Sequence, residues 1–259
     1  MINRLFCAGA CWLLLVSPVA AADWRQFRGN DQSSAAAAAL PTKFSAEENL
    51  AWKTALSGRG VSGPIVVGDK VILTSSRGHR DDRLAVTAYS TADGKKAWDR
   101  QFRCTGSTGC HPKMCMATPT PASDGKHIVA FYSCNDVACL DLDGNVLWFR
   151  GLTHDYPNAS NTVGMSSSPL IVGDVVVVQV ENQADSFAAG LDMKTGANRW
   201  KIKRTEGPSW SSPTLLKGKN GKPDLVLLQS SDRLSAVDPA TGKAAWEWKT
   251  PVNIIPSVT

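Results

Sequence analysis

The chain has 259 residues, of which 43% are hydrophobic and 20% are charged, and its formal net charge is +5. This composition is ordinary for a globular protein and supplies enough apolar material for a sizeable core. The positive residues are scattered and form no dense stripe of Lys and Arg, which argues against a protein that binds nucleic acid.

Residues 1–22 have the pattern of a secretory signal peptide. Arg4 supplies the positive charge, residues 5–16 are apolar, and residues 20–22 are three alanines that suit a cleavage site. Because the apolar stretch is short for a bilayer span, cleavage is favoured over a retained anchor. We expect a mature protein, residues 23–259, that is periplasmic or secreted and has no transmembrane segment.

Tryptophans recur in the rest of the chain at intervals of about 50 residues, which is typical of repeat architectures. Each repeat begins with small residues and a proline, continues with an aliphatic stretch, and ends with a glycine followed four positions later by a tryptophan. The prolines are Pro64, Pro119, Pro169 and Pro213. The glycine and tryptophan pairs are Gly94 and Trp98, Gly144 and Trp148, Gly196 and Trp200, and Gly242 and Trp246.

This spacing predicts hairpins that present a large ring at a fixed place on the strand that follows the turn. Glycine permits the positive φ of a tight turn, and the tryptophan can fill the wedge between neighbouring sheets. The β-branched residues and frequent turns indicate strands, and four-stranded units of this size bury both faces by stacking radially as blades. The predicted fold is an all-β propeller with four antiparallel blades at about 60–102, 115–150, 165–203 and 209–250; a solenoid of β-units is the alternative.

Two flanking segments suggest that the ring of blades is partial. Residues 49–56, around Trp52, look like only the closing strand of a blade, and residues 253–259 look like the start of another. Raw sheet edges would remain exposed in such a fragment. The alternative is a natural short form that closes its ring by oligomerising.

Several segments resemble a known repeat. Residues 190–200 and 236–246 are similar to the tryptophan-docking motif of PQQ-like propellers, residues 138–148 match with one deletion, and the first repeat departs by having Ser90 in place of an Asp. Residues 23–29 are similar to the start of exported planctomycete-type members. The resemblance extends to the outer-membrane assembly (BamB-like) propellers, and it implies a complete ring of seven or eight blades.

Two long linkers, residues 99–118 and 149–168, carry the candidate ligand-binding side chains. The resemblance places both linkers on the face that holds the ligand funnel in catalytic relatives, although loop length can also be merely tolerated. The candidates are His111, Lys113, His154, Asp155, Tyr156 and, from a shorter loop, Trp210. For the adjacent His154 and Asp155, structural hydrogen bonding is the favoured alternative to acid–base chemistry.

The first linker contains Cys104, Cys110 and Cys115. We expect a disulfide within this loop in an oxidising compartment; a zinc site completed by His111, and free thiols, are the alternatives. Cys134 and Cys139 flank a predicted two-residue turn that would place Cys139 opposite Tyr132. The two sulfurs would then be too far apart to pair, so we interpret Cys139 as a core residue.

Glu181, Asn182 and Asp185 lie on the predicted turn between the second and third strands of the third blade. Their oxygen atoms are candidate Ca²⁺ ligands, because quinoprotein dehydrogenases use Ca²⁺ to polarise their quinone. A solvated polar turn is the favoured interpretation. The sequence has no nucleophile motif and no clear match to the catalytic Asp of those enzymes, so no catalytic residue is assigned.

These observations favour a non-catalytic binding or scaffold protein that uses the propeller face to hold a protein or a small ligand. The first alternative is a dehydrogenase that uses PQQ and Ca²⁺ to oxidise alcohols or sugars, or a degenerate relative. The second is a carbohydrate-binding module, suggested by Trp210 and Tyr156. The sequence leans away from an enzyme and from any bound cofactor.

Overall fold

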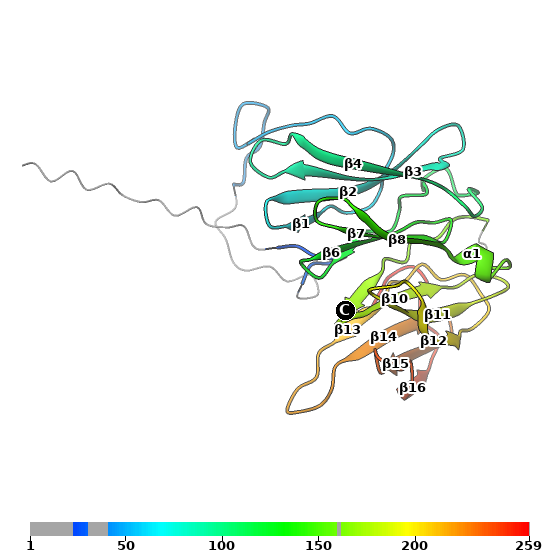
Figure 1. Ribbon diagram of the computed structural model, residues 1–259. Coiled ribbons are helices and arrows are strands. Elements are labelled where there is room, and N and C mark those ends of the chain that lie inside the picture. Colours follow the sequence, from blue (N-terminus) through cyan, green and yellow to red (C-terminus); the bar gives the residue numbers. More distant parts are fainter. Residues whose placement is uncertain (1–22, 31–40, 160–161, 259) are drawn as a thin grey trace, which may run out of the picture.

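The computed structural model describes residues 23–30, 41–159 and 162–258, so the predicted signal peptide lies outside the described residues. The described chain forms four separate sheets, each with four antiparallel strands in sequence order (Figure 1). The prediction of an all-β fold built from four-stranded antiparallel blades is confirmed.

The strands of the first two blades are β1 (Ile65–Val67), β2 (Lys70–Arg77), β3 (Arg83–Ser90), β4 (Lys96–Arg103), β5 (Ala122–Ser123), β6 (His127–Phe131), β7 (Asp136–Asp141) and β8 (Val146–Gly151). Those of the last two are β9 (Leu170–Val172), β10 (Val175–Val180), β11 (Phe187–Asp192), β12 (Asn198–Lys203), β13 (Thr214–Leu216), β14 (Leu225–Ser230), β15 (Arg233–Val237) and β16 (Ala244–Lys249). The short helix α1 (Leu152–Asp155) directly follows β8.

The sheets stack face to face, because successive residues of a strand point to opposite faces and both faces carry apolar side chains. In β6, Ile128 and Ala130 belong to the core shared with the first blade, whereas Val129 and Phe131 belong to the core shared with the third. A third core joins the last two blades. This double burial explains why the inner strands read as continuous apolar runs.

A tryptophan from each of the first three blades docks on the glycine turn of the next blade. The indole nitrogen of Trp148 donates a 2.8 Å hydrogen bond to the carbonyl of Met193, and a Cβ at Gly196 would lie 2.7 Å from the Trp148 ring. Equivalent contacts join Trp52 to Gly94, Trp98 to Gly144 and Trp200 to Gly242. The repeated glycines are therefore needed both for their positive φ and for the space that the ring occupies.

A chain of backbone-to-hydroxyl bonds links the inner ends of the blades. The amide of Gly63 donates to the Thr120 hydroxyl, and the amide of Thr120 donates to the Ser168 hydroxyl. The series continues from Ser168 to Ser212 and from Ser212 to Ser257, at distances of 2.9 and 2.8 Å. These hydroxyls satisfy amides that no strand partner reaches.

This series corrects the predicted alignment of the second repeat. The residue before the repeat proline is Gly63, Ser168 or Ser212 in the other blades, and its equivalent is Thr120. The matching proline is therefore Pro121 and not Pro119. The sequence Thr118-Pro119-Thr120-Pro121 fits the pattern in two registers, and only the contact between blades distinguishes them.

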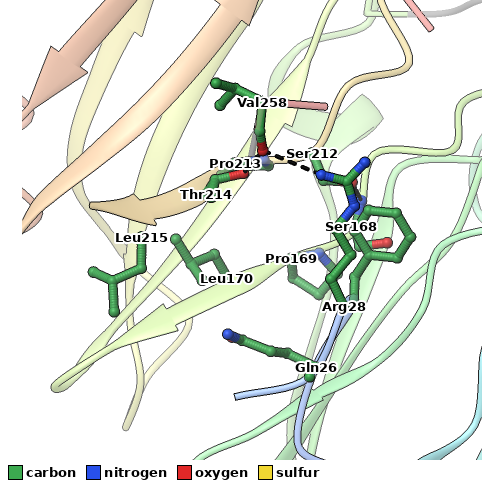
Figure 2. A pocket seen from close by; sticks show the side chains of 12 residues that line it. Gln26, Arg28, Ser168, Pro169, Leu170, Ser212, Pro213, Thr214, Leu215 and Val258 are labelled. Atoms are coloured by element: carbon green, nitrogen blue, oxygen red, sulfur yellow. Dashed lines mark hydrogen bonds between the residues drawn. The ribbon is translucent and has the colours of Figure 1, made fainter. Parts of the chain in front are cut away.

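The segment that opens the described chain crosses the inner ends of several blades. Trp24 exchanges two 2.8 Å backbone bonds with Val66 of β1, and the amide of Ser123 in β5 donates to the carbonyl of Arg25. Further along, the Arg28 guanidinium donates to the carbonyls of Ser257 and Val258, which lie near β13 (Figures 1 and 2). The two ends of the described chain thus meet at one end of the space between the blades.

Residues 50–56 and 253–258 contain no strand in the structure. Trp52 still docks on the first blade, whereas Trp246 and Trp248 on β16 remain 41% and 62% exposed. The predicted position of Cys139 is wrong: it lies opposite Val129, because the turn between β6 and β7 is longer than two residues.

Candidate functional site

A hollow on the described surface has a volume of about 460 Å³ and lies where the chain enters each blade. One lining residue comes from each repeat, two positions before the member of the inter-blade hydrogen-bond series. These five residues are Val61, Thr118, Ser166, Trp210 and Ile255. Equivalent positions of the five repeats therefore line the same hollow, which we call the funnel hollow.

The first long linker forms one wall of the funnel hollow through His111, Lys113 and Met114. The amide of His111 donates a 3.0 Å bond to the carbonyl of Val163, another lining residue from the second linker. The Arg59 guanidinium donates to the carbonyl of Pro112 at 2.5 Å. These contacts hold the wall against both neighbouring blades.

Trp210 is fixed at both its backbone and its ring. Its amide donates to the carbonyl of Ile254, and its indole nitrogen donates to the carbonyl of Gly164 at 2.9 Å. Since the polar atom of the ring is already satisfied, the ring offers an apolar surface to a ligand.

The funnel hollow combines an apolar floor with a basic rim. Val61 and Ile255 are 48% and 70% exposed, and Lys113 and His111 are exposed beside them. None of its described lining residues is acidic. Such a surface can bury an apolar group and attract a carboxylate, and its titratable side chains are those of His111 and Lys113.

The space continues inward. A second cavity of about 320 Å³ shares the five repeat residues and extends to Phe27 and Arg28. Beyond it, a cavity of only about 20 Å³ lies among Gln26, Arg28 and Leu170 (Figure 2), which is room for about one water molecule.

The candidates on the second linker lie elsewhere. Asp155, in α1, forms a 2.6 Å ion pair with Arg150. The Tyr156 hydroxyl accepts a 2.6 Å bond from Asn198, and the Lys201 ammonium lies 3.8 Å from the centre of the Tyr156 ring.

His154 is exposed and is not among the residues that line the funnel hollow. Of the six ligand candidates, the structure brings together His111, Lys113 and Trp210 and separates His154, Asp155 and Tyr156 from them.

The three calcium-ligand candidates are occupied by protein partners. The Glu181 carboxylate is buried against the Arg204 guanidinium at 3.0 Å and the Ser230 hydroxyl at 2.6 Å. Burial raises the pKa of Glu181, and the charge of Arg204 opposes that rise.

The Asn182 side chain bonds the backbone of its own turn, at Ala184 and Asp185. The Asp185 carboxylate lies 3.9 Å from the Lys201 ammonium, so each of the three side chains already has a protein partner.

All five described cysteines are free thiols, and their arrangement differs from the predicted one. Cys104 has Cys134 as its sulfur neighbour, across the boundary between the first two blades. Cys110 and Cys115 instead direct their thiols to the carbonyls of Met114 and Arg59. Cys139 is buried as predicted, and burial raises its pKa to about 12.

Sequence reasoning missed most of the apolar lining. Val61, Thr118 and Ser166 carry no chemical signal of their own, and Ile255 and Met114 look like ordinary apolar residues. Four of these residues can be found from their position in the repeat: Val61, Thr118, Ser166 and Ile255. Each lies three residues before the position of the repeat proline, which is occupied by Val258 in the last repeat. The corrected alignment at Pro121 makes this register visible.

The fold and the docking contacts define the chain as a PQQ-like β-propeller protein. The family model described as "Outer membrane protein assembly factor BamB" matches residues 42–247, and the chain belongs to this family. No curated protein sequence matches it.

Several solved structures share the fold at low sequence identity. A europium-containing methanol dehydrogenase aligns with a TM-score of 0.55 and 17% identity over 73% of this chain and 41% of that one. BamB from Moraxella catarrhalis aligns with a TM-score of 0.53 and 18% identity over 78% of this chain and 55% of that one. The quinohemoprotein alcohol dehydrogenase from Comamonas testosteroni aligns with a TM-score of 0.55 and 16% identity over 75% of this chain and 36% of that one. The chain thus spans between about a third and a little over half of these structures.

The helix of the described part is far too short and polar to serve as a membrane span.

Proposed function

We propose that the protein is a non-catalytic, extracytoplasmic binding protein. Its funnel hollow takes an apolar side chain of a partner polypeptide that has a carboxylate close by. The observation that carries the proposal is the lining itself: the ring of Trp210 and the side chains of Val61, Met114 and Ile255 face a common space, with Lys113 at the rim. The extracytoplasmic location rests on residues 1–22 and on the family.

The energetics suit recognition of a short segment. Burying one Leu- or Phe-sized side chain contributes about 1.5–3 kcal/mol, whereas an exposed pair between a carboxylate and Lys113 contributes about 0–1 kcal/mol. The apolar anchor therefore supplies most of the affinity, and the charge selects among anchors. A sugar, which needs several hydrogen-bond partners, matches this lining less well.

The dehydrogenase alternative has less support from the described residues. Glu181 is neutralised by Arg204, and the funnel hollow lacks a described carboxylate that could serve as a general base. Methanol and alcohol oxidation are stated for the structural neighbours, which share the fold but whose chains this one covers only in part.

The proposal is tested by selecting binders from a phage-displayed library of random short peptides. We expect the selected peptides to place an aromatic or large aliphatic residue next to Asp or Glu. Fluorescence anisotropy then compares their affinity for the wild type and for Val61→Asp and Ile255→Asp. Both positions are exposed, so folding is preserved, and we expect losses of about tenfold or more, equivalent to about 1.4 kcal/mol.

Trp248→Ser is the matched control, because Trp248 is an exposed aromatic residue outside the funnel hollow. Its affinity should equal that of the wild type. Unchanged binding in Val61→Asp and Ile255→Asp, or a selection without acidic and apolar residues, would refute the proposal. Dye reduction with methanol after addition of PQQ and Ca²⁺ would instead establish the dehydrogenase.

A further inference from the structure

Three side chains meet at the boundary between the first and second blades, away from the residues that line the funnel hollow. The sulfur atoms of Cys104 and Cys134 and a carboxylate oxygen of Asp136 all lie within 4.8 Å of one another. Among the described residues, this is the one such group of three or more His, Cys, Asp or Glu side chains. Cys104 belongs to the linker after β4, whereas Cys134 lies on the turn between β6 and β7.

The backbone is shaped to bring the two cysteines together. A Cβ at Gly106 would collide with the carbonyl oxygen of Cys134, and a Cβ at Gly151 would collide with the Thr105 hydroxyl. Glycine at both positions allows the linker to lie directly between the β6–β7 turn and the end of β8. Thr105, the residue next to Cys104, is therefore held between these two segments.

Asp136 also fixes the position of Thr105. It accepts a 2.8 Å bond from the amide of Thr105 and a short one from the Thr105 hydroxyl. Its other bond comes from the thiol of Cys134, at 3.3 Å. Each of its two oxygens is thus already bonded, in an arrangement that orients the carboxylate toward the Cys134 proton.

The two thiols differ in accessibility. Cys134 is 1% exposed, whereas Cys104 is partly exposed and directs its thiol to the carbonyl of Gly106. Burial raises the pKa of Cys134, so this thiol needs a proton acceptor before it can react. Burial likewise raises the pKa of Asp136, which brings it closer to that of a useful acceptor.

We propose that Cys104 and Cys134 form a reversible disulfide that ties the first long linker to the second blade, with Asp136 as the proton acceptor for Cys134. The oxidant is a low-molecular-weight disulfide such as oxidised glutathione. The Cys104 thiol loses its proton to water, and its thiolate attacks one sulfur of the oxidant; this forms a mixed disulfide and releases one glutathione thiolate, which takes up a proton from water. Cys134 then transfers its proton to Asp136, and its thiolate attacks the Cys104 sulfur and expels the second glutathione thiolate.

The balance is two protein thiols and one glutathione disulfide converted to one protein disulfide and two glutathione thiols. A metal ion is a less suitable occupant, because both Asp136 oxygens and the Cys104 thiol already have partners. The linker anchored in this way runs on to His111, Lys113 and Met114, so the bond would fix the start of the loop that forms a wall of the funnel hollow.

The test uses the full chain equilibrated with mixtures of reduced and oxidised glutathione and then alkylated. Peptide mass spectrometry should find Cys104 and Cys134 in one disulfide-linked species, with Cys110, Cys115 and Cys139 alkylated as thiols. The melting temperature of the oxidised protein should exceed that of the reduced protein by about 5–10 °C, because the bond closes a long loop. Cys104→Ser should abolish this difference, and Cys110→Ser should leave it intact.

The Asp136→Asn variant tests the role of Asp136 as proton acceptor separately from the pairing of Cys104 with Cys134. The disulfide should still form, but its second step should slow by about tenfold or more near neutral pH and recover as the pH rises. An equal rate for Asp136→Asn and the wild type would overturn the role of Asp136.

Free thiols at Cys104 and Cys134 under oxidising conditions, or a bond from Cys104 to Cys110 or Cys115, would overturn the pairing. So would one equivalent of zinc that is retained by the wild type and lost in Cys134→Ser. None of these outcomes bears on peptide binding, so this inference and the proposed function can fail separately.

Discussion

Docking of tryptophan on glycine can be isolated by two alanine substitutions in the third blade. Gly173 and Gly196 both have positive φ, at +59° and +72°, but a Cβ at Gly173 meets nothing within 4 Å, whereas one at Gly196 meets the Trp148 ring at 2.7 Å. Alanine at Gly173 therefore adds only backbone strain, whereas alanine at Gly196 adds the same strain and displaces Trp148.

The expected losses of folding free energy in the two variants differ by the contribution of the docked Trp148 ring. Strain of an L-residue in the left-handed region costs about 1–2 kcal/mol. Displacing Trp148 removes its hydrogen bond to Met193, worth about 1 kcal/mol, and part of its packing, worth about another 1–2 kcal/mol. Gly196→Ala should thus unfold at a melting temperature about 5–10 °C lower than Gly173→Ala.

Differential scanning calorimetry of both variants and the wild type gives the comparison, with urea unfolding as a second measure. Equal destabilisation by the two substitutions would refute the docking argument, because strain would then account for the whole effect. A larger loss at Gly173 would contradict it more strongly.

Three further expectations concern stability. Trp200→Ala should cost about 3–5 kcal/mol because Trp200 is 7% exposed and bonded to Pro239, whereas Trp248→Ala should change urea stability by less than about 0.5 kcal/mol. Glu181→Gln should cost about 3–5 kcal/mol by leaving Arg204 buried without its charge partner, and Glu206→Gln, in an exposed pair with Lys203, should be nearly neutral. The Arg233 guanidinium lowers the pKa of Asp232 from 3.8 to about 2, so this contribution to stability is present above pH 3.8 and is lost as the pH falls toward 2; a thermal-melting series on Asp232→Asn should lack that loss.

The regular part of the fold could be predicted because it follows from repeated local patterns. The spacing from Gly144 to Trp148 and its three equivalents predicts hairpins and a ring in the wedge between blades. The structure has the four hairpins and places the rings of Trp98, Trp148 and Trp200 between blades, whereas Trp246 stays exposed. Whether the segment around Trp52 forms a strand could not be judged from its motif, since a strand needs a hydrogen-bonding partner from elsewhere in the chain. The second repeat was misaligned because Thr118-Pro119 and Thr120-Pro121 look alike, and only the bond from Thr120 to Ser168 separates them.

The candidate site was predicted in part for similar reasons. Trp210, His111 and Lys113 stood out by residue type on loops, and the structure places all three at the funnel hollow. Tyr156 stood out equally, but α1 turns the chain so that its ring packs on Phe187. The proximity of Cys104 to Cys134 could not be predicted, because it depends on the close approach of the linker at Gly106 to the backbone of Cys134. No local sequence pattern encodes such a contact between distant segments.

Hydrogen–deuterium exchange with a selected acidic and apolar peptide would locate binding to the funnel hollow without any substitution. We expect slower exchange in the first linker around His111–Met114 and in the segments around Val61, Trp210 and Ile255. Exchange in β16 and in α1 should not change. Protection confined to α1 and Tyr156, or to the exposed tryptophans of β16, would contradict the funnel hollow as the binding site.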